Sequence, residues 1–177
     1  ATDGAGAGAS VVFGVIIGTG CGGGIAINGK PVGGLNGIGG EWGHNPLPYQ
    51  RVYMATQLQH GFKGEDASIA YATTEKDWAE YPGDACYCGK RGCQELWISG
   101  TGFKMDYQRV TGEDLGTHDV IANARKGEPK ALAALERYAD RLARSLSVVI
   151  NIIDPDVIVL GGGMSNVAYL YDRVPQL

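Results

Sequence analysis

Clusters of glycine at the ends of apolar segments constrain this chain more than any other feature. The 177 residues include 29 glycines, which gather at 4–8, 18–24, 33–43 and 161–163. A flexible linker would scatter its glycines among polar residues, whereas these clusters interrupt apolar, β-branched runs. Backbone without side chains can approach a ligand closely, so the clusters indicate turns that bind a ligand.

The apolar runs between these clusters predict the first part of an α/β fold. Residues 11–17 are mostly β-branched and predict a strand, and residues 25–27 predict a second strand after a glycine turn at 18–24. Asn28-Gly29 favours a type I′ turn, since both residues tolerate positive φ. The Gly- and Pro-rich residues 33–48 predict a loop.

The rest of the chain predicts helices followed by one more strand. The pattern indicates two short helices within 94–110, broken at Gly100-Thr101-Gly102, and weak helical turns near 52–59 and 68–72. The remaining elements are a helix over 118–126, a long amphipathic helix over 129–153, and a strand over 157–160 that we expect to be buried on both faces.

The long helix begins at Pro129 and ends before Asp154-Pro155. Its expected apolar face consists of Leu132, Leu135, Leu142, Leu146, Val149, Ile150 and Ile153, flanked by Arg137, Arg141 and Arg144. A mixed sheet with helices packed on it is the architecture that this order of elements suits.

Charge and hydropathy exclude two classes of partner. The chain has 15 basic and 19 acidic residues and a formal charge of −4, with no basic stripe that could neutralise nucleic acid. Its apolar stretches are far shorter than the ~20 residues of a membrane-spanning helix. The first ten residues lack the features of a signal peptide. We therefore expect a cytoplasmic protein that binds neither nucleic acid nor membrane directly.

Three cysteines predict a metal site. Cys86, Cys88 and Cys93 lie within eight residues, with glycines between them that let the backbone curl around one point. Thiolates with one imidazole form a tetrahedral zinc site, whereas a disulfide is the less favoured alternative because Cys-x-Cys pairs poorly. His44, in the Gly-rich loop, is the favoured fourth ligand over His60 and His118. Four protein ligands imply a structural zinc.

Two glycine loops are candidates for binding a nucleotide. Gly18, Thr19 and Gly20 open a turn between two strands, whose backbone N–H groups could hold phosphates; the alternative is a hairpin without a ligand. Gly161, Gly162 and Gly163 follow a buried strand, where a base or ribose could lie against bare backbone; the alternative is a plain turn. Two such loops at strand ends favour a nucleotide cleft.

Glu41, His44 and Glu95 are candidates for binding a polyol. Carboxylates accept strong hydrogen bonds from hydroxyl groups. As isolated residues both glutamates would be ordinary solvated side chains. Their attachment to the predicted metal loop favours a sugar site.

These motifs together resemble the ROK (repressor, open reading frame, kinase) family over nearly the whole chain. The resemblance rests on the glycines at 18–20 and 161–163, the sequence GGEWGH at 39–44, and CYCGKRGCQE at 86–95. EWGHNPLP at 41–48 and ISGTG at 98–102 are similar to the fructokinase and mannokinase branch.

The resemblance implies an actin-like ATPase (ribonuclease H-like) fold, with residues 1–177 as the second lobe of a two-lobed sugar kinase and a zinc-binding subregion at 41–95. It implies zinc at His44, Cys86, Cys88 and Cys93, a hexose at Glu41, His44 and Glu95, ATP phosphates at Gly18, Thr19 and Gly20, and adenosine at Gly161, Gly162 and Gly163.

The implied reaction is transfer of the γ-phosphoryl group of Mg-ATP to the 6-hydroxyl of fructose, mannose or glucose, by a homodimer. The family's catalytic Asp lies in an Asn-Asp pair upstream of the segment matching 3–6, so we expect no catalytic base in this chain and no activity from it alone. The alternative is part of a sugar-sensing ROK repressor with a helix-turn-helix elsewhere.

Overall fold

A computed structural model describes residues 3–52 and 75–177. The strands are β1 (Val11–Ile17), β2 (Cys21–Ile27), β3 (Lys30–Pro31) and β4 (Val157–Gly161). The α-helices are α2 (Glu95–Ile98), α3 (Gly100–Thr111), α4 (Thr117–Arg125), α5 (Pro129–Ile153) and α6 (Ala168–Arg173). Short 3₁₀ helices span Gly4–Gly6, Glu75–Trp78, Gly163–Asn166 and Val174–Gln176. The helical turns predicted near 52–59 and 68–72 lie almost wholly outside the described residues, as does His60.

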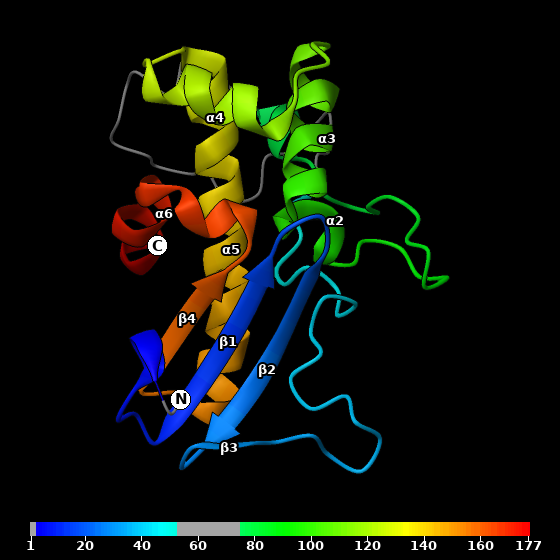
Figure 1. Cartoon of the computed structure of the whole chain (residues 1–177). Coiled ribbons are helices and arrows are strands. Elements are labelled where there is room, and N and C mark those ends of the chain that lie inside the picture. Colours follow the sequence, from blue (N-terminus) through cyan, green and yellow to red (C-terminus); the bar gives the residue numbers. More distant parts are fainter. Residues whose placement is uncertain (1–2, 53–74) are drawn as a thin grey trace.

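The strands form a mixed sheet in the order β3-β2-β1-β4 (Figure 1). β1 pairs antiparallel with β2 and parallel with β4. The predicted turn at Asn28-Gly29 is confirmed by φ values of 49° and 74°. Because β1 and β4 are parallel, their carboxyl ends, and the glycine loops that follow them, lie at the same edge of the sheet.

β2 begins at Cys21, so the prediction that the glycine turn extends to residue 24 is wrong. Gly22, Gly23 and Gly24 pair in register with Ile16, Val15 and Gly14. A Cβ atom on Gly23 would lie 2.7 Å from the carbonyl oxygen of Gly40 and 2.8 Å from the Phe13 ring. Glycine occurs inside this strand because the loop before His44 crosses it at backbone contact.

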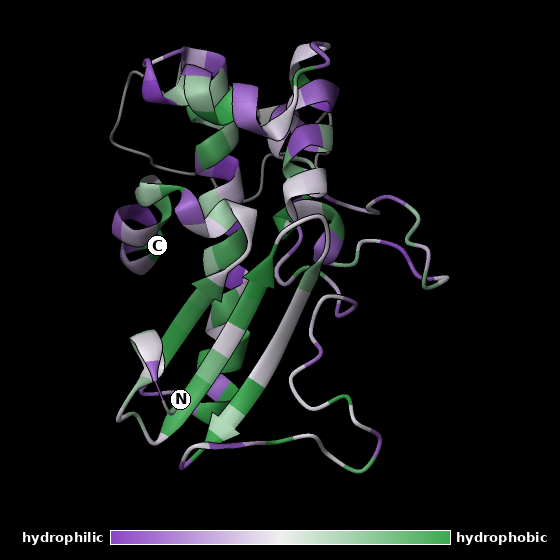
Figure 2. Cartoon of the chain, in the orientation of Figure 1, coloured by the Kyte–Doolittle hydropathy of each residue, from purple (hydrophilic) through white to green (hydrophobic). Residues whose placement is uncertain are grey.

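The core lies between the sheet and α5, the long helix predicted over 129–153. Phe13, Val15 and Ile17 of β1 pack into one cluster with Leu135 and Leu142 of α5. Figure 2 shows hydrophobic colour along β1 and β4 and a paler first half of β2, where the glycines lie. The helix begins where the Glu128 carboxylate accepts hydrogen bonds from the backbone of Lys130 and Ala131.

β4 is only half-buried along its length, so the prediction that both its faces are buried is wrong. Ile16 of β1 is 58% exposed, because its side chain points away from the core that β1 shares with α5. Ile150 is 45% exposed, although Val149 and Ile153 near it on α5 are partly buried against the core, so the prediction that Ile150 belongs to the buried apolar face is wrong.

The predicted break at Gly100-Thr101-Gly102 is also misplaced. These three residues form the first turn of α3, and the two helices separate at Ser99. The Ser99 hydroxyl accepts a hydrogen bond of 2.9 Å from the backbone N–H of Gly102. The N-cap therefore stabilises a turn that glycine alone would disfavour.

Charged side chains are buried between α3, α5 and the segment that precedes the cysteines. Arg137 and Arg141 were expected to flank the apolar face of α5, yet they are 0% and 1% exposed. Asp106 of α3 accepts hydrogen bonds from Arg137 Nε at 2.8 Å and lies 3.1 Å from Arg141 Nη1. Arg141 Nε donates to Glu80 at 2.8 Å. Paired carboxylates allow these arginines to be buried.

Arg144 on the same helix contacts two segments of the chain, one after His44 and one before Cys86. It donates to Glu80 at 2.7 Å and to the carbonyl oxygens of Pro48 and Tyr49. The segment after His44 and the segment before Cys86 are thereby attached to one rigid helix. No helix in the described part of the chain is both long enough and apolar enough to cross a membrane.

Candidate functional site

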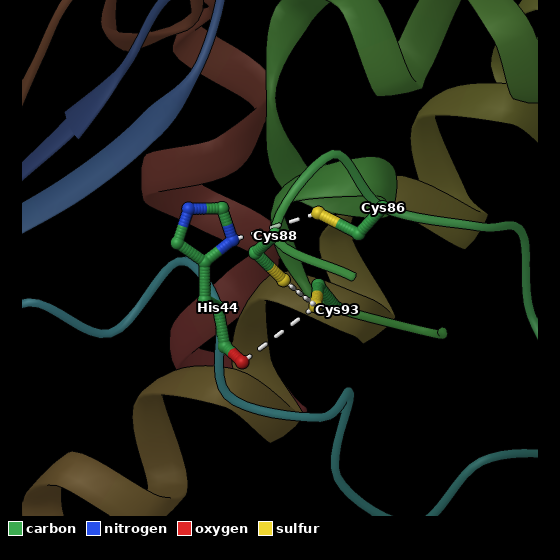
Figure 3. Close-up of side chains that lie close together, drawn as sticks. All are labelled: His44, Cys86, Cys88 and Cys93. Atoms are coloured by element: carbon green, nitrogen blue, oxygen red, sulfur yellow. Dashed lines mark hydrogen bonds between the residues drawn. The ribbon is translucent and has the colours of Figure 1, made fainter. Parts of the chain in front are cut away.

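His44, Cys86, Cys88 and Cys93 form one group, as Figure 3 shows. One ligand atom from each of the four lies within 4.8 Å of all the others. His44 Nδ1 lies 3.5 Å from Cys86 Sγ, and the sulfur atoms of Cys88 and Cys93 are 3.5 Å apart. All four cysteines of the chain are free thiols. The other candidate within the described residues, His118, is exposed on α4 and does not belong to the group.

Backbone pairing brings the two halves of this group together. Pro46 and Cys93 form an isolated β-bridge. Two hydrogen bonds of 2.9 Å flank this bridge. Leu47 N–H donates to the Gly92 carbonyl oxygen, and Gln94 N–H donates to the Asn45 carbonyl oxygen. His44 thus comes beside the cysteines although 42 residues separate it from Cys86.

The donor set and its spacing fit a zinc ion. In a tetrahedral zinc site with ordinary bond lengths, neighbouring sulfur and nitrogen ligands are about 3.5–3.8 Å apart. Burial raises the pKa of the Cys93 thiol to about 12, whereas a backbone hydrogen bond from Lys90 lowers the pKa of Cys88. A divalent cation would stabilise the thiolate at Cys93, which the apolar surroundings disfavour.

Glu41 and Glu95 lie beside the start of β2. Glu95 Oε2 accepts a hydrogen bond of 3.0 Å from the backbone N–H of Cys21. Glu41 Oε2 lies 3.9 Å from the point where a Cβ on Gly22 would be. Burial, followed by the negative charges of Glu95 and Glu41, raises the pKa of the Cys21 thiol to about 12. Both carboxylates therefore lie near Cys21.

The two predicted glycine loops meet at the edge where β1 and β4 end. A Cβ atom on Gly162, whose φ is 85°, would lie 2.8 Å from the Ile17 carbonyl group and 3.0 Å from Gly18 N. Gly18 in turn accepts a hydrogen bond of 2.7 Å from the Gly100 backbone N–H. Ligands of open α/β sheets bind beyond the carboxyl ends of parallel strands, which is where these loops lie.

The phosphate-loop candidates also touch a sugar-site candidate. A Cβ atom on Gly20 would lie 2.9 Å from Glu95 Oε2. The structure therefore brings Gly18–Gly20, Gly161–Gly163, Glu41, His44 and Glu95 to one region of the molecule. A shallow cavity of about 510 Å³ on the outer face of β1, β2 and β4 adjoins this region, because Glu41 and Gly161 are among the residues that line it.

Tyr87 also lies in this region, although the sequence patterns did not predict it. Its hydroxyl lies 2.9 Å from His44 Nε2, and the two rings meet edge to face with centroids 4.9 Å apart. Partial loss of hydration, followed by the charge and a hydrogen bond of Glu95, raises the pKa of Tyr87. Its place between Cys86 and Cys88 is the sequence signal that could have identified it.

The chain is similar in sequence to known sugar kinases. An N-acetyl-D-glucosamine kinase from Pectobacterium atrosepticum is 39% identical over 165 residues, which are 93% of this chain and 47% of that protein. The chain thus spans about half the length of the curated relatives that it matches.

Two solved structures share the fold. A ROK family glucokinase from Streptomyces griseus, in complex with glucose and AMPPNP, has a TM-score of 0.72 at 24% identity, covering 98% of this chain and 51% of that one. A ROK family transcriptional regulator, a homolog of the E. coli MLC protein, has a TM-score of 0.66 at 23% identity, covering 94% and 37%.

The fold is mixed α/β and of the actin-like ATPase type, as the sequence predicted. The model of the ROK family matches residues 1–177. This chain therefore belongs to the ROK family.

Proposed function

We propose that this chain is the second lobe of an ATP-dependent hexose kinase of the fructokinase or mannokinase type. The observation that carries the proposal is the contact between Glu95 and the turn after β1. Its carboxylate is bonded to Cys21 N–H and lies against Gly20, so a sugar held by Glu95 would adjoin phosphates held by Gly18–Gly20. Phosphoryl transfer depends mainly on such positioning.

The sugar would be held by Glu41, His44 and Glu95. Their carboxylates and imidazole suit hydroxyl groups, because charge-assisted hydrogen bonds are strong and directional. His44, Cys86, Cys88 and Cys93 would hold a structural zinc ion, and four protein ligands leave no position open for chemistry. Residues 41–95 would thus form a zinc-binding subregion that keeps the sugar wall rigid.

The nucleotide would lie across the two glycine loops. Backbone N–H groups of Gly18, Thr19 and Gly20 would face the phosphates of Mg-ATP, and Gly161, Gly162 and Gly163 would lie against adenosine. The contact of Gly162 with Ile17 and Gly18 supports one continuous site.

The γ-phosphoryl group would pass to the sugar 6-hydroxyl, with an Asp outside this chain as the general base. The 177-residue chain alone would then be inactive. We also propose that the whole protein is a cytoplasmic homodimer.

The test is sugar-dependent release of ADP by the full-length protein. Fructose, mannose, glucose and N-acetylglucosamine are each supplied with Mg-ATP, and the coupled oxidation of NADH is followed. We expect ADP release that requires sugar and is fastest with fructose or mannose. ATP turnover that does not respond to any of the four sugars would contradict the proposal.

The second candidate is a sugar-sensing repressor, since a ROK transcriptional regulator shares the fold. The contact of Glu95 with the phosphate turn favours the kinase, because a sugar sensor has no need to place a sugar beside phosphates. Sequence-specific DNA binding by the full-length protein that changes on addition of a hexose, without ADP release, would favour the repressor.

A further inference from the structure

Gln94 carries a buried amide between two residues of the proposed site. It follows Cys93, a proposed zinc ligand, and precedes Glu95, a proposed sugar ligand. Gln94 is 2% exposed, and its Nε2 donates a hydrogen bond of 2.7 Å to the backbone carbonyl oxygen of Trp42. Burial of an amide is unfavourable unless the amide is hydrogen-bonded, so this bond allows a polar side chain to occupy the interior here.

The Trp42 carbonyl oxygen also closes the turn that contains His44. It accepts a second hydrogen bond, of 2.9 Å, from the backbone N–H of Asn45. A carbonyl oxygen has two lone pairs, and both are used here. The peptide group that follows Trp42 is therefore held in one orientation. Glu41 lies just before this turn and His44 lies within it, so the directions of both side chains depend on that orientation.

The Trp42 side chain is fixed against the sheet. Its indole N–H donates a hydrogen bond of 3.0 Å to the Gly22 carbonyl oxygen, and its ring packs edge to face on Phe13 with centroids 5.3 Å apart. Trp42 is 4% exposed. Its ring is thus anchored to β1 and β2, and its carbonyl group is anchored to Gln94.

Backbone bonds alone do not specify this arrangement. Gln94 N–H donates to the Asn45 carbonyl oxygen at 2.9 Å, and Glu95 N–H donates to the Gly43 carbonyl oxygen at 3.0 Å. Any residue type except proline could form these two bonds, since both use backbone groups. The bond from the Gln94 side chain to Trp42, in contrast, requires a side-chain donor of this length at position 94.

We propose that Gln94 is a positioning residue of the sugar site: through the Trp42 carbonyl group it sets the places of Glu41 and His44 relative to Glu95. The proposal rests on the proposed function, because it takes these three side chains as sugar ligands. Without the Gln94 amide, the peptide group after Trp42 loses one of its two bonds and can rotate. Glu41 and His44 then shift, while Glu95 keeps its own bond to β2.

The experiment measures equilibrium binding by calorimetry on the full-length, zinc-loaded protein. Fructose, mannose, glucose and N-acetylglucosamine are each titrated without nucleotide, and Mg-AMPPNP is titrated without sugar. Gln94→Met keeps the length of the side chain and removes the amide. The matched control is Tyr138→Phe, because Tyr138 is 1% exposed and its hydroxyl donates a hydrogen bond of 2.7 Å to the Ile98 carbonyl oxygen. Zinc per chain and urea unfolding are measured for every variant.

Gln94→Met should bind sugar about 10- to 100-fold more weakly, since Glu41 and His44 then form poorer charge-assisted hydrogen bonds. Its affinity for Mg-AMPPNP should change less than about twofold, the smallest effect of one hydrogen bond. The reason is that neither Trp42 nor Asn45, to which Gln94 is bonded, belongs to the proposed nucleotide loops. Tyr138→Phe loses a comparable buried bond, so we expect similar destabilisation in urea and unchanged affinity for sugar.

A second variant tests the proposal if Gln94→Met does not fold. Trp42→Phe keeps an aromatic ring against Phe13 and removes the indole N–H that bonds to Gly22. This change frees the other end of the same residue, so sugar should bind about 2- to 12-fold more weakly, the effect of one hydrogen bond. Binding of Mg-AMPPNP should not change. Unchanged sugar affinity in the folded Trp42→Phe variant would overturn the proposal.

Unchanged sugar affinity in Gln94→Met would also overturn it, as would equal weakening of sugar and Mg-AMPPNP binding, which would show general damage. Equal loss of sugar affinity in Tyr138→Phe would have the same meaning. Loss of zinc from Gln94→Met would make Gln94 a structural residue of the proposed zinc site and would overturn the proposal too. Sugar binding by the wild type without phosphoryl transfer contradicts only the proposed kinase activity, whereas no sugar binding by the wild type overturns both proposals.

Discussion

Replacing Asp106 by Asn tests whether the buried charges hold α3 and α5 together. The Asp106 carboxylate accepts hydrogen bonds from Arg137 Nε at 2.8 Å and Arg109 Nη2 at 2.7 Å, and lies 3.1 Å from Arg141 Nη1. Asn keeps the shape of the side chain, removes its charge and directs an amide group at the guanidinium groups. Arg137 and Arg141 would then be buried with too little negative charge.

Removal of one partner from a buried ion pair lowers the free energy of unfolding by about 3–5 kcal/mol. The control is Asp114→Asn, which breaks the ion pair between Asp114 and Lys104. The Asp114 side chain is 66% exposed and the Lys104 side chain is 40% exposed. Exposed pairs contribute about 0–1 kcal/mol. Urea unfolding at pH 7, followed by circular dichroism, compares the two variants. A difference between them of less than about 1 kcal/mol would show that the buried charges of Asp106 stabilise the protein no more than an exposed pair does.

The pH dependence has a definite sign. Burial by itself raises the pKa of Asp106. The charges of Arg141, Arg137 and Arg109 lower the pKa by a larger amount, so it falls well below the usual range. The stability that Asp106 contributes is therefore fully present above the unfolded pKa of about 3.9 and is lost as the pH falls through the folded pKa. The wild type should keep its advantage over Asp106→Asn down to about pH 4. An advantage that disappears near pH 6 would contradict this assignment.

Three further variants test the site. Cys93→Ser should abolish stoichiometric zinc in metal analysis, because Cys93 is a proposed ligand and is 1% exposed. A chelator should then no longer lower the temperature of thermal unfolding. Full zinc occupancy in this variant would exclude Cys93 as a ligand. Glu95→Gln should raise the KM for sugar about 10- to 100-fold, the effect of a charge-assisted hydrogen bond, with little change in the KM for ATP; equal effects on both would show general damage. Gly162→Ala should raise the KM for ATP more than that for sugar, since its φ of 85° and the 2.8 Å approach to Ile17 leave no room for a Cβ; steady-state kinetics with an unchanged KM for ATP would argue against an adenosine role for this loop.

The elements with clear end signals were predictable from the sequence. α5 spans Pro129–Ile153 as predicted, because Pro129 suits the first turn and Asp154-Pro155 stops the helix. The grouping of His44 with three cysteines was predictable, because the spacing of the cysteines is encoded locally within 86–93 and a single loop supplies His44.

The burial of Arg137 and Arg141 was not predictable, because assigning the faces of a helix from its periodicity places every charged residue on the solvent side. Arg137 and Arg141 are buried only because Asp106 and Glu80 reach them from 31 and 61 residues away. The glycines of β2 were assigned to a turn, since the backbone contact between Gly23 and Gly40 is a tertiary feature. The contact of Tyr87 with His44 depends on the direction of the Tyr87 side chain, which the spacing of the cysteines around it does not determine.

The proposed kinase transfers a phosphoryl group to the 6-hydroxyl of a hexose. The direct measurement is ³¹P and ¹³C NMR of the products that the full-length protein forms from Mg-ATP and ¹³C-labelled fructose or mannose. We predict a phosphate ester whose coupling appears on C6. Unmodified sugar, or a phosphate attached at another carbon, would contradict the proposed function.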